Sequence, residues 1–220
     1  MRLYIRLSKN RQVIPFSYQQ LLTGTIHKWI GHLNEEHGKP SLYSFSWLQN
    51  TRAEKNGIHL NQDAYFFISA YDTNLIKRIT KGILSDPSTF FGSRVIDVQI
   101  KEAPAFSSEE RFFLNSPILL RQKDELGKTK HITFQDEEFD SLLTKNLKSK
   151  LRKANLSEDN VFVGLDKSYP TPQTKLINYK GIENKTTLAP VIIKGSPEQI
   201  SFAWTVGLGE STGIGFGAIK

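Results

Sequence analysis

The hydrophobic pattern predicts a strand and then a helix at the start of the chain. Residues 2–7 alternate strictly between apolar and polar side chains, which is the period of a half-buried strand. From Tyr18 to Leu33 the apolar residues recur at spacings of three and four, which predicts an amphipathic helix. Ser17 is the expected N-cap. The helix should end before Gly38, since glycine favours a helix end and a proline follows.

The pattern up to residue 100 predicts a complete supersecondary unit. A second helix should begin at Asp72 or Thr73 and carry apolar residues at helical spacing. The polar stretch 49–57 is expected to be a hairpin loop. The predicted strands span residues 42–48, 58–60, 64–70 and 95–100. The resulting order, β-α-β-β-α-β, is the ferredoxin-like arrangement, in which two helices cover one face of an antiparallel sheet.

The second half of the chain is richer in predicted strands. A helix is expected from about Asp136, and short strands are expected at residues 118–121, 131–134, 161–163, 175–179, 188–193 and 200–206. We interpret this half as a second, degenerate ferredoxin-like unit, which gives an α+β fold of two tandem domains. The stretch 104–110 is the expected linker, so the predicted domains are residues 1–103 and 111–220.

Composition and charge narrow the class of protein. The 220 residues are 38% hydrophobic, enough for one or two compact domains, and no apolar run is long enough to span a membrane. The absence of cysteine excludes disulfides, zinc ribbons, iron–sulfur clusters and thiol nucleophiles, and fits a cytoplasmic protein. Charges interrupt the opening residues, so no secretory signal is expected there. The net charge of +7 favours a polyanionic partner.

The C-terminus, VGLGESTGIGFGAIK, has the most unusual composition. Five of the fifteen glycines fall in its last fourteen residues. Glycine lets main-chain N–H groups approach an anion, so this loop could cradle a phosphate or an RNA backbone. A dinucleotide-binding loop is excluded because Thr212 stands where its third glycine would be. The simpler alternative is a turn and bulge between two strands. The candidate RNA-binding glycines are Gly207, Gly209, Gly213 and Gly215.

Histidines around the first helix are candidates for proton transfer. His27 lies about 150° around the helix from its apolar stripe, so we expect it to face away from the core. His37 follows the helix in a polar turn that could fold back toward His27. Imidazole exchanges protons near neutral pH, although an exposed helical histidine is more commonly a surface residue. The histidine spacing does not match a metal site, so we expect neither a metal nor another cofactor.

Basic residues supply candidate phosphate contacts. Lys28 on the first helix, and Arg52 and Lys55 in the predicted hairpin loop, are candidates for RNA binding, with a solvated surface as the alternative. A dense basic run at residues 145–153 follows acidic residues at 136–140. This distribution also complements a helix macrodipole. The chain has no Ser-His-Asp or Gly-x-Ser-x-Gly arrangement and no carboxylate spacing typical of a two-metal nuclease.

The opening strand MRLYIRL, the helix YQQLLTGTIH and the terminal GLGESTGIGFGAIK together resemble one family. The chain is similar to the CRISPR-associated endoribonucleases that cut repeat RNA into guide units, the sixth Cas family of the RAMP superfamily. The resemblance implies metal-independent cleavage by 2′-hydroxyl attack, which leaves 5′-hydroxyl and 2′,3′-cyclic phosphate ends. It also implies an acid–base role for His27 and His37, an electrostatic role for Lys39, and RNA contacts at the glycine loop.

Two other functions stay open at this point. The chain could be a non-catalytic RNA-binding subunit of a CRISPR effector, since the same scaffold and glycine loop would serve it. It could also be a ribosome- or translation-associated ferredoxin-like protein, although the glycine-rich end would then have no purpose. The expected partner is CRISPR repeat RNA, and other effector subunits or a second copy of the chain are further candidates. No membrane partner is expected.

Overall fold

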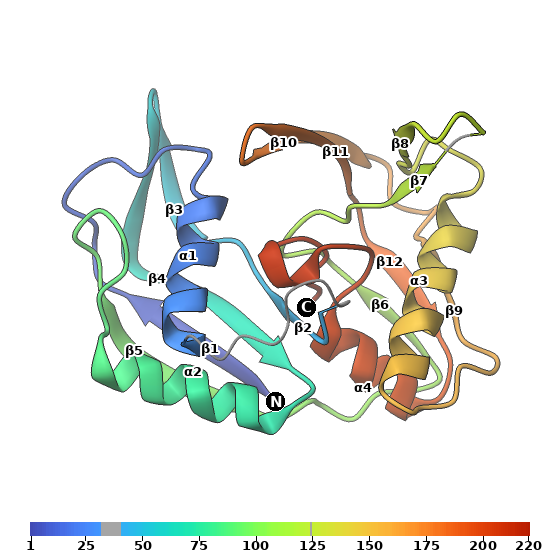
Figure 1. The fold of residues 1–220 in the computed structure, drawn as a ribbon, viewed down its shortest axis with the longest axis horizontal. Coiled ribbons are helices and arrows are strands. Elements are labelled where there is room, and N and C mark those ends of the chain that lie inside the picture. The colour runs from blue at the N-terminus through green and yellow to red at the C-terminus, as the bar shows by residue number, and fades with distance from the viewer. Residues whose placement is uncertain (32–40, 124) are drawn as a thin grey trace.

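The N-terminal half is an antiparallel sheet covered on one face by two helices. The structure, a computed structural model, describes residues 1–31, 41–123 and 125–220 (Figure 1). The elements of this half are β1 (Arg2–Leu7), α1 (Gln19–Ile30), β2 (Tyr43–Phe45), β3 (Gln49–Glu54), β4 (Gly57–Ala70), α2 (Thr73–Ser85) and β5 (Val95–Lys101). The strand order is β2-β4-β1-β5, and β3 pairs with β4 beyond that path. Both helices lie in front of the sheet in Figure 1.

The C-terminal half is built from shorter strands and two helices beside the first half. Its elements are β6 (Glu109–Phe112), β7 (Arg121–Lys123), β8 (Thr129–His131), α3 (Phe139–Lys153), β9 (Phe162–Leu165), β10 (Gln173–Tyr179), β11 (Ile182–Leu188), β12 (Val191–Lys194), α4 (Pro197–Val206) and a 3₁₀ turn at Thr212–Ile214. The sheet has the order β6-β12-β9, while β7–β8 and β10–β11 form separate two-stranded hairpins.

The two halves share one topology. The four strands of a ferredoxin-like unit lie in the spatial order 4-1-3-2. In the first half, β5, β1, β4 and β2 follow one another across the sheet in that order. In the second, β6, β12 and β9 take positions 1, 3 and 2, and an isolated bridge between Leu114 and Ile219 stands where the fourth strand would be. The predicted α+β fold of two tandem ferredoxin-like units, the second degenerate, is therefore confirmed.

The predicted hairpin loop at residues 49–57 was placed wrongly. Residues 49–54 form β3, and β4 continues without a break from Gly57 to Ala70. The β3–β4 hairpin projects beyond the rest of the sheet (Figure 1), so its middle residues are polar and the apolar pattern that marks a strand is lost. Ser17 is not the N-cap of α1, because that position is taken by Tyr18, whose side chain makes no capping hydrogen bond.

The predicted strand at residues 200–206 is instead the helix α4. Ser196 accepts a hydrogen bond from the Gln199 backbone nitrogen, and the Gln199 side chain accepts one from the Ser196 backbone nitrogen. This capping box, with Pro197 in the first turn, starts a helix. The stretch ISFAWTV is apolar on nearly every side because α4 is buried among other elements, so its periodicity is hidden.

Most of the buried apolar residues form two clusters. One is drawn from residues 3–95 and the other from residues 112–219. The division of the chain at residues 104–110 agrees with this separation but stays a prediction. Among the helices of the described residues, none combines the length and apolarity that a bilayer crossing requires.

Candidate functional site

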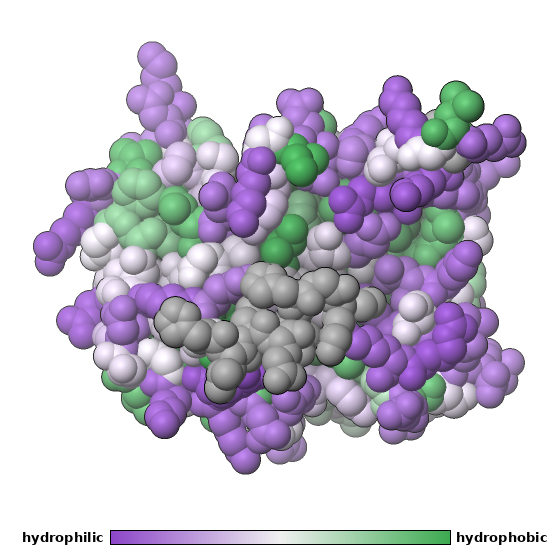
Figure 2. All heavy atoms as spheres, viewed as in Figure 1, coloured by the Kyte–Doolittle hydropathy of each residue, from purple (hydrophilic) through white to green (hydrophobic). Residues whose placement is uncertain are grey.

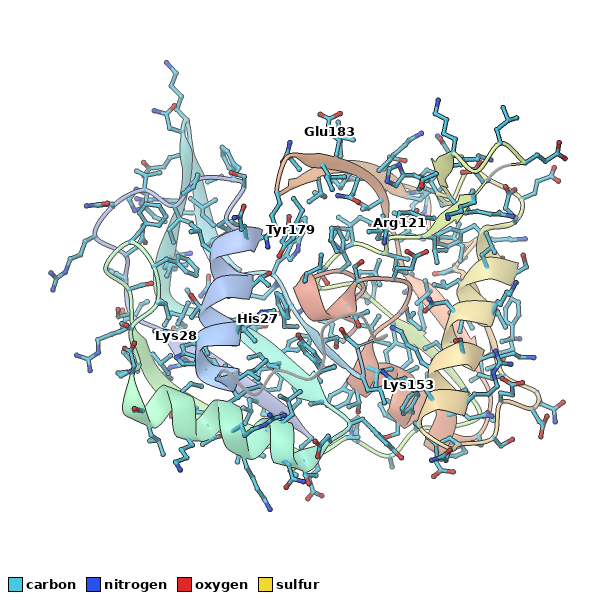
Figure 3. All side chains as sticks on the ribbon, viewed as in Figure 1. His27, Lys28, Arg121, Lys153, Tyr179 and Glu183 are labelled. Carbon is cyan, nitrogen blue, oxygen red and sulfur yellow. The ribbon has the colours of Figure 1, made fainter. Side chains whose placement is uncertain are left out.

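His27 lies at the junction of the two halves. It is half-buried near the end of α1, next to Ile26, Trp29 and Ile30, which are buried in the first cluster. Figure 3 shows His27 on the side of α1 that faces the C-terminal half, and Lys28 on the other side. The helix therefore turns its apolar stripe to its own sheet and His27 to the neighbouring half, as the helical periodicity predicts.

Tyr43 connects His27 to the glycine-rich C-terminal segment, residues 207–220. The Tyr43 hydroxyl donates a hydrogen bond to the carbonyl oxygen of Gly213 over 3.0 Å. The Tyr43 hydroxyl oxygen also lies 3.5 Å from His27 Nε2. Because the hydroxyl proton is directed to Gly213, the Tyr43 oxygen faces His27 as an acceptor, which favours a proton on Nε2. A strand, a helix and the C-terminal segment thus meet at this imidazole.

The C-terminal segment is also fixed by hydrogen bonds with the N-terminal half. The Trp47 indole nitrogen donates to the Gly215 carbonyl oxygen over 2.9 Å, and the Thr212 hydroxyl donates to the Tyr43 carbonyl oxygen over 2.8 Å. Ser44 donates to the carbonyl oxygen of Thr205, just before the segment begins. These contacts place the segment against β2.

The C-terminal half fixes the same segment through two charged residues. Arg121 binds the Glu210 carboxylate with its backbone nitrogen and its guanidinium, at 3.0 and 2.9 Å. Lys150, which is only 4% exposed, donates from Nζ to the Gly207 carbonyl oxygen over 3.0 Å. Burial lowers the pKa of Lys150 to about 7. Sequence analysis did not select Arg121 or Tyr43, and it considered Lys150 only as part of the basic run 145–153 that could contact phosphate, whereas Lys150 is buried against the segment.

The four candidate glycines are packed against protein. All are buried, and a Cβ atom at any of them would lie within 3 Å of another residue: Gly217 and Ser44 for Gly207, Leu119 and Ile118 for Gly209, Ser41 and Tyr43 for Gly213, and Phe45 for Gly215. Glycine is therefore required here for close approach of chain to chain. Contact between these glycines and RNA stays a prediction.

The remaining candidate residues are distributed away from this junction or lie outside the described residues. Lys28 Nζ lies 2.8 Å from Asp86 Oδ2 and donates to the Ser88 carbonyl oxygen, and this interaction holds the pKa of Asp86 well below its usual range. On the β3–β4 hairpin, Arg52 pairs with Glu54 at 3.0 Å, and Lys55 is exposed at the turn. His37 and Lys39 fall within residues 32–40, which lie outside the described residues.

Comparison with known proteins identifies the family. The family described as CRISPR associated protein Cas6, C-terminal, matches residues 100–220. The chain is 30% identical over 243 residues to the CRISPR-associated endoribonuclease-like protein Cas6 of Pyrococcus furiosus, covering 100% of this chain and 98% of that protein. The chain belongs to the Cas6 family. This agrees with the resemblance seen in the sequence.

Solved structures agree with this placement among Cas6 proteins. A Cas6-related protein from Pyrococcus furiosus superposes with a TM-score of 0.86 at 26% identity, covering 100% of this chain and 97% of that one. A RAMP protein described as binding different RNA substrates superposes with a TM-score of 0.84 at 21% identity, covering 100% and 98%. The second likeness shows the fold alone. The tandem ferredoxin-like architecture is thus that of Cas6 and RAMP proteins.

Proposed function

We propose that this Cas6 protein is a metal-independent endoribonuclease that cuts CRISPR repeat RNA into guide units. The ribose 2′-hydroxyl attacks the adjacent phosphorus, the bond to the 5′-oxygen breaks, and the products carry a 2′,3′-cyclic phosphate and a 5′-hydroxyl. One group must take the 2′ proton and another must protonate the leaving oxygen. The observation that supports this function most strongly is the meeting of His27 with the glycine-rich segment through Tyr43.

His27 has the position that an acid–base group needs. It is half-buried, so it can be oriented by protein on one side and reach RNA on the other. The Tyr43 oxygen lies 3.5 Å from His27 Nε2 and orients the imidazole for proton exchange with RNA. We assign the second proton transfer to His37 and stabilisation of the charged phosphorane to Lys39, as the family resemblance implies.

The test is single-turnover cleavage of the cognate repeat RNA. His27→Ala should slow cleavage at least about a hundredfold, the lower range for loss of a general acid or base, while RNA affinity changes less than about twofold. His59→Ala is the matched control, because His59 is another half-buried histidine of the same half and pairs with Glu54. It should cleave at the wild-type rate. Replacing the 2′-hydroxyl at the cut site by hydrogen should abolish cleavage, and EDTA should leave it unchanged.

Three results would contradict the proposed function or its site. Unchanged cleavage by His27→Ala removes His27 from the site. Loss of cleavage in EDTA that is restored by a divalent cation contradicts the metal-independent mechanism. Tight binding of repeat RNA without any cleavage by the wild type identifies the chain as the alternative, a non-catalytic RNA-binding subunit of a CRISPR effector.

A further inference from the structure

A groove lies between the start of α1 and the β10–β11 hairpin of the other half. It encloses about 400 Å³, and we call it the hairpin groove. Its lining comes from three separate parts of the chain: residues 16–19, Trp47, and residues 176–178. The volume falls within the range of about 300–1,000 Å³ typical of small-molecule sites. In Figure 1 the hairpin extends toward the start of α1, so the groove opens between the two halves.

The groove contains a buried amide with an unused nitrogen. Gln19 is only 4% exposed, and among the described residues its Nε2 has no hydrogen-bond partner. A buried polar group without a partner costs about 1–3 kcal/mol. Gln19 lines the groove, but its Nε2 has almost no accessible surface, so a ligand in the groove satisfies this nitrogen only after the side chain turns toward it. Whichever way the amide is turned, it offers one donor and one acceptor side by side.

The walls of the groove are aromatic and aliphatic. Phe16 is 59% exposed and Leu176 is 62% exposed, and both line the groove. Trp47 is held in place because its indole nitrogen donates to the Gly215 carbonyl oxygen. Large apolar side chains gathered around a groove mark an interaction site. Figure 2 shows hydrophobic residues between hydrophilic ones on this face of the molecule, in the upper part of the view.

The charge beside the groove favours a phosphate-bearing ligand. The β10–β11 hairpin carries three exposed lysines, Lys175, Lys180 and Lys185, against one acidic residue, Glu183. Flat apolar walls, an amide pair and nearby lysines are the combination by which proteins hold single-stranded RNA: bases stack on aromatic rings and bond through their edges, while phosphates meet basic side chains. A purely apolar ligand would leave Gln19 unpaired.

From these observations we infer that the hairpin groove is a subsite for one unpaired nucleobase of the bound RNA, stacked against Phe16 and Trp47 and hydrogen-bonded to Gln19. The inference rests on the proposed RNA function and adds a specificity-determining contact to it. Gln19 and His27 are eight residues apart on α1, about 12 Å along the helix. The base therefore belongs to a nucleotide about two to four positions from the cut.

The test is an abasic scan of the repeat RNA, with affinity measured by fluorescence anisotropy. One position within about four nucleotides of the cut should lose about tenfold in affinity when its base is removed. Phe16→Ala and Gln19→Leu should each weaken binding of intact RNA about tenfold, and neither should weaken binding of the RNA that is abasic at that position. Phe113→Ala, another exposed phenylalanine, and Gln20→Leu, the exposed neighbour, are matched controls that should bind as the wild type does.

A stability measurement excludes simple misfolding. Because the Gln19 amide is unpaired within the described residues, Gln19→Leu should leave the melting temperature unchanged or raise it while affinity falls. In addition, 2-aminopurine at the sensitive position should be quenched by the wild type and less so by Phe16→Ala.

The outcomes separate this inference from the function on which it rests. A scan without a sensitive position, with cleavage intact, overturns the nucleobase subsite and leaves the endoribonuclease in place; the groove would then belong to a protein partner. Equal losses for Phe16→Ala on intact and abasic RNA also overturn it. Failure of the wild type to bind repeat RNA at all overturns both.

Discussion

The guanidinium of Arg2 donates a hydrogen bond over 2.8 Å to the carbonyl oxygen of Trp204, a residue 202 positions away. It also donates to the Ile219 carbonyl oxygen over 2.9 Å and lies 3.5 Å from the centre of the Trp204 ring. Arg2 is fully buried in β1. A single side chain of the first strand therefore fixes both α4 and the end of the C-terminal segment, and through them the junction at which His27 lies.

Replacing Arg2 should destabilise the whole chain. Arg2→Met leaves two buried carbonyl oxygens and Ser69 without their donor, so we expect the free energy of unfolding to fall by about 2–4 kcal/mol. Chemical denaturation followed by fluorescence measures it. Arg6→Met, an exposed change on the same strand, should alter stability by less than about 0.5 kcal/mol. Equal stability of the two variants would show that the Arg2 contacts contribute nothing net.

Lys150 should make stability depend on pH. Its folded-state pKa is about 7 because of burial, whereas an unfolded lysine titrates near 10.4. Between these values the unfolded chain binds more protons than the folded one, so stability rises with pH, by up to about 1.4 kcal/mol per pH unit. Below pH 7 the folded state carries the full cost of a buried charge.

The measurement is the difference in unfolding free energy between the wild type and Lys150→Met, taken from pH 6 to 10. The difference should be flat below about pH 7 and should grow in favour of the wild type above it. For Lys145→Met, at an exposed position of α3, the difference in unfolding free energy from the wild type should instead stay constant from pH 6 to 10. A constant difference between Lys150→Met and the wild type over the same pH range would mean that the buried amine does not titrate there.

Tyr43 should act as a positioning residue for His27. Tyr43→Phe removes the oxygen that faces Nε2 and the hydrogen bond to Gly213, so His27 loses the acceptor that favours a proton on Nε2. We expect about tenfold slower cleavage with RNA affinity nearly unchanged, and a shifted pH–rate profile. Tyr71→Phe, which is 43% exposed and packs on Phe202, should keep the wild-type rate and profile. Wild-type kinetics in Tyr43→Phe would contradict the assignment.

The sequence predicted elements well where one face of an element is buried and the other is exposed. β1 from Leu3 to Leu7 and α2 are examples, because their alternating and three-to-four patterns survive in the burial of their residues, whereas Arg2, on the polar side of the β1 pattern, is buried. The helix α4 was missed because burial on most sides removes the periodicity, even though Ser196, Pro197 and Gln199 carry a capping-box pattern that predicts a helix start. At α4 the capping residues predict the helix, whereas the hydrophobic pattern does not.

Part of the site could be predicted and part could not. The orientation of His27 follows from helical geometry alone, since its angle around α1 separates it from the stripe, while its acid–base role rests on the family resemblance. Lys150 was visible as well: it lies on the same helical face as Leu143 and Leu147, and a lysine on an apolar stripe predicts a buried amine. The role of Tyr43 could not be predicted, because it depends on contacts with His27, 16 positions away in the sequence, and with Gly213, 170 positions away. Periodicity predicts which face of an element is buried, but it does not predict which residues of other elements pack against that face.

The density of glycine in the C-terminal segment should prove to be a packing requirement. Gly217 has φ +67°, and a Cβ there would lie 1.8 Å from the Leu208 carbonyl oxygen. Gly217→Ala should therefore cost about 3 kcal/mol or more, from left-handed strain together with overpacking. Gly127 also has a positive φ of +77°, but a Cβ there meets open space, so Gly127→Ala should cost about 1–2 kcal/mol. Thermal unfolding of both variants measures the difference. Similar melting temperatures would mean that close packing at Gly217 is not what requires glycine, and would favour a role for the segment in contacting RNA.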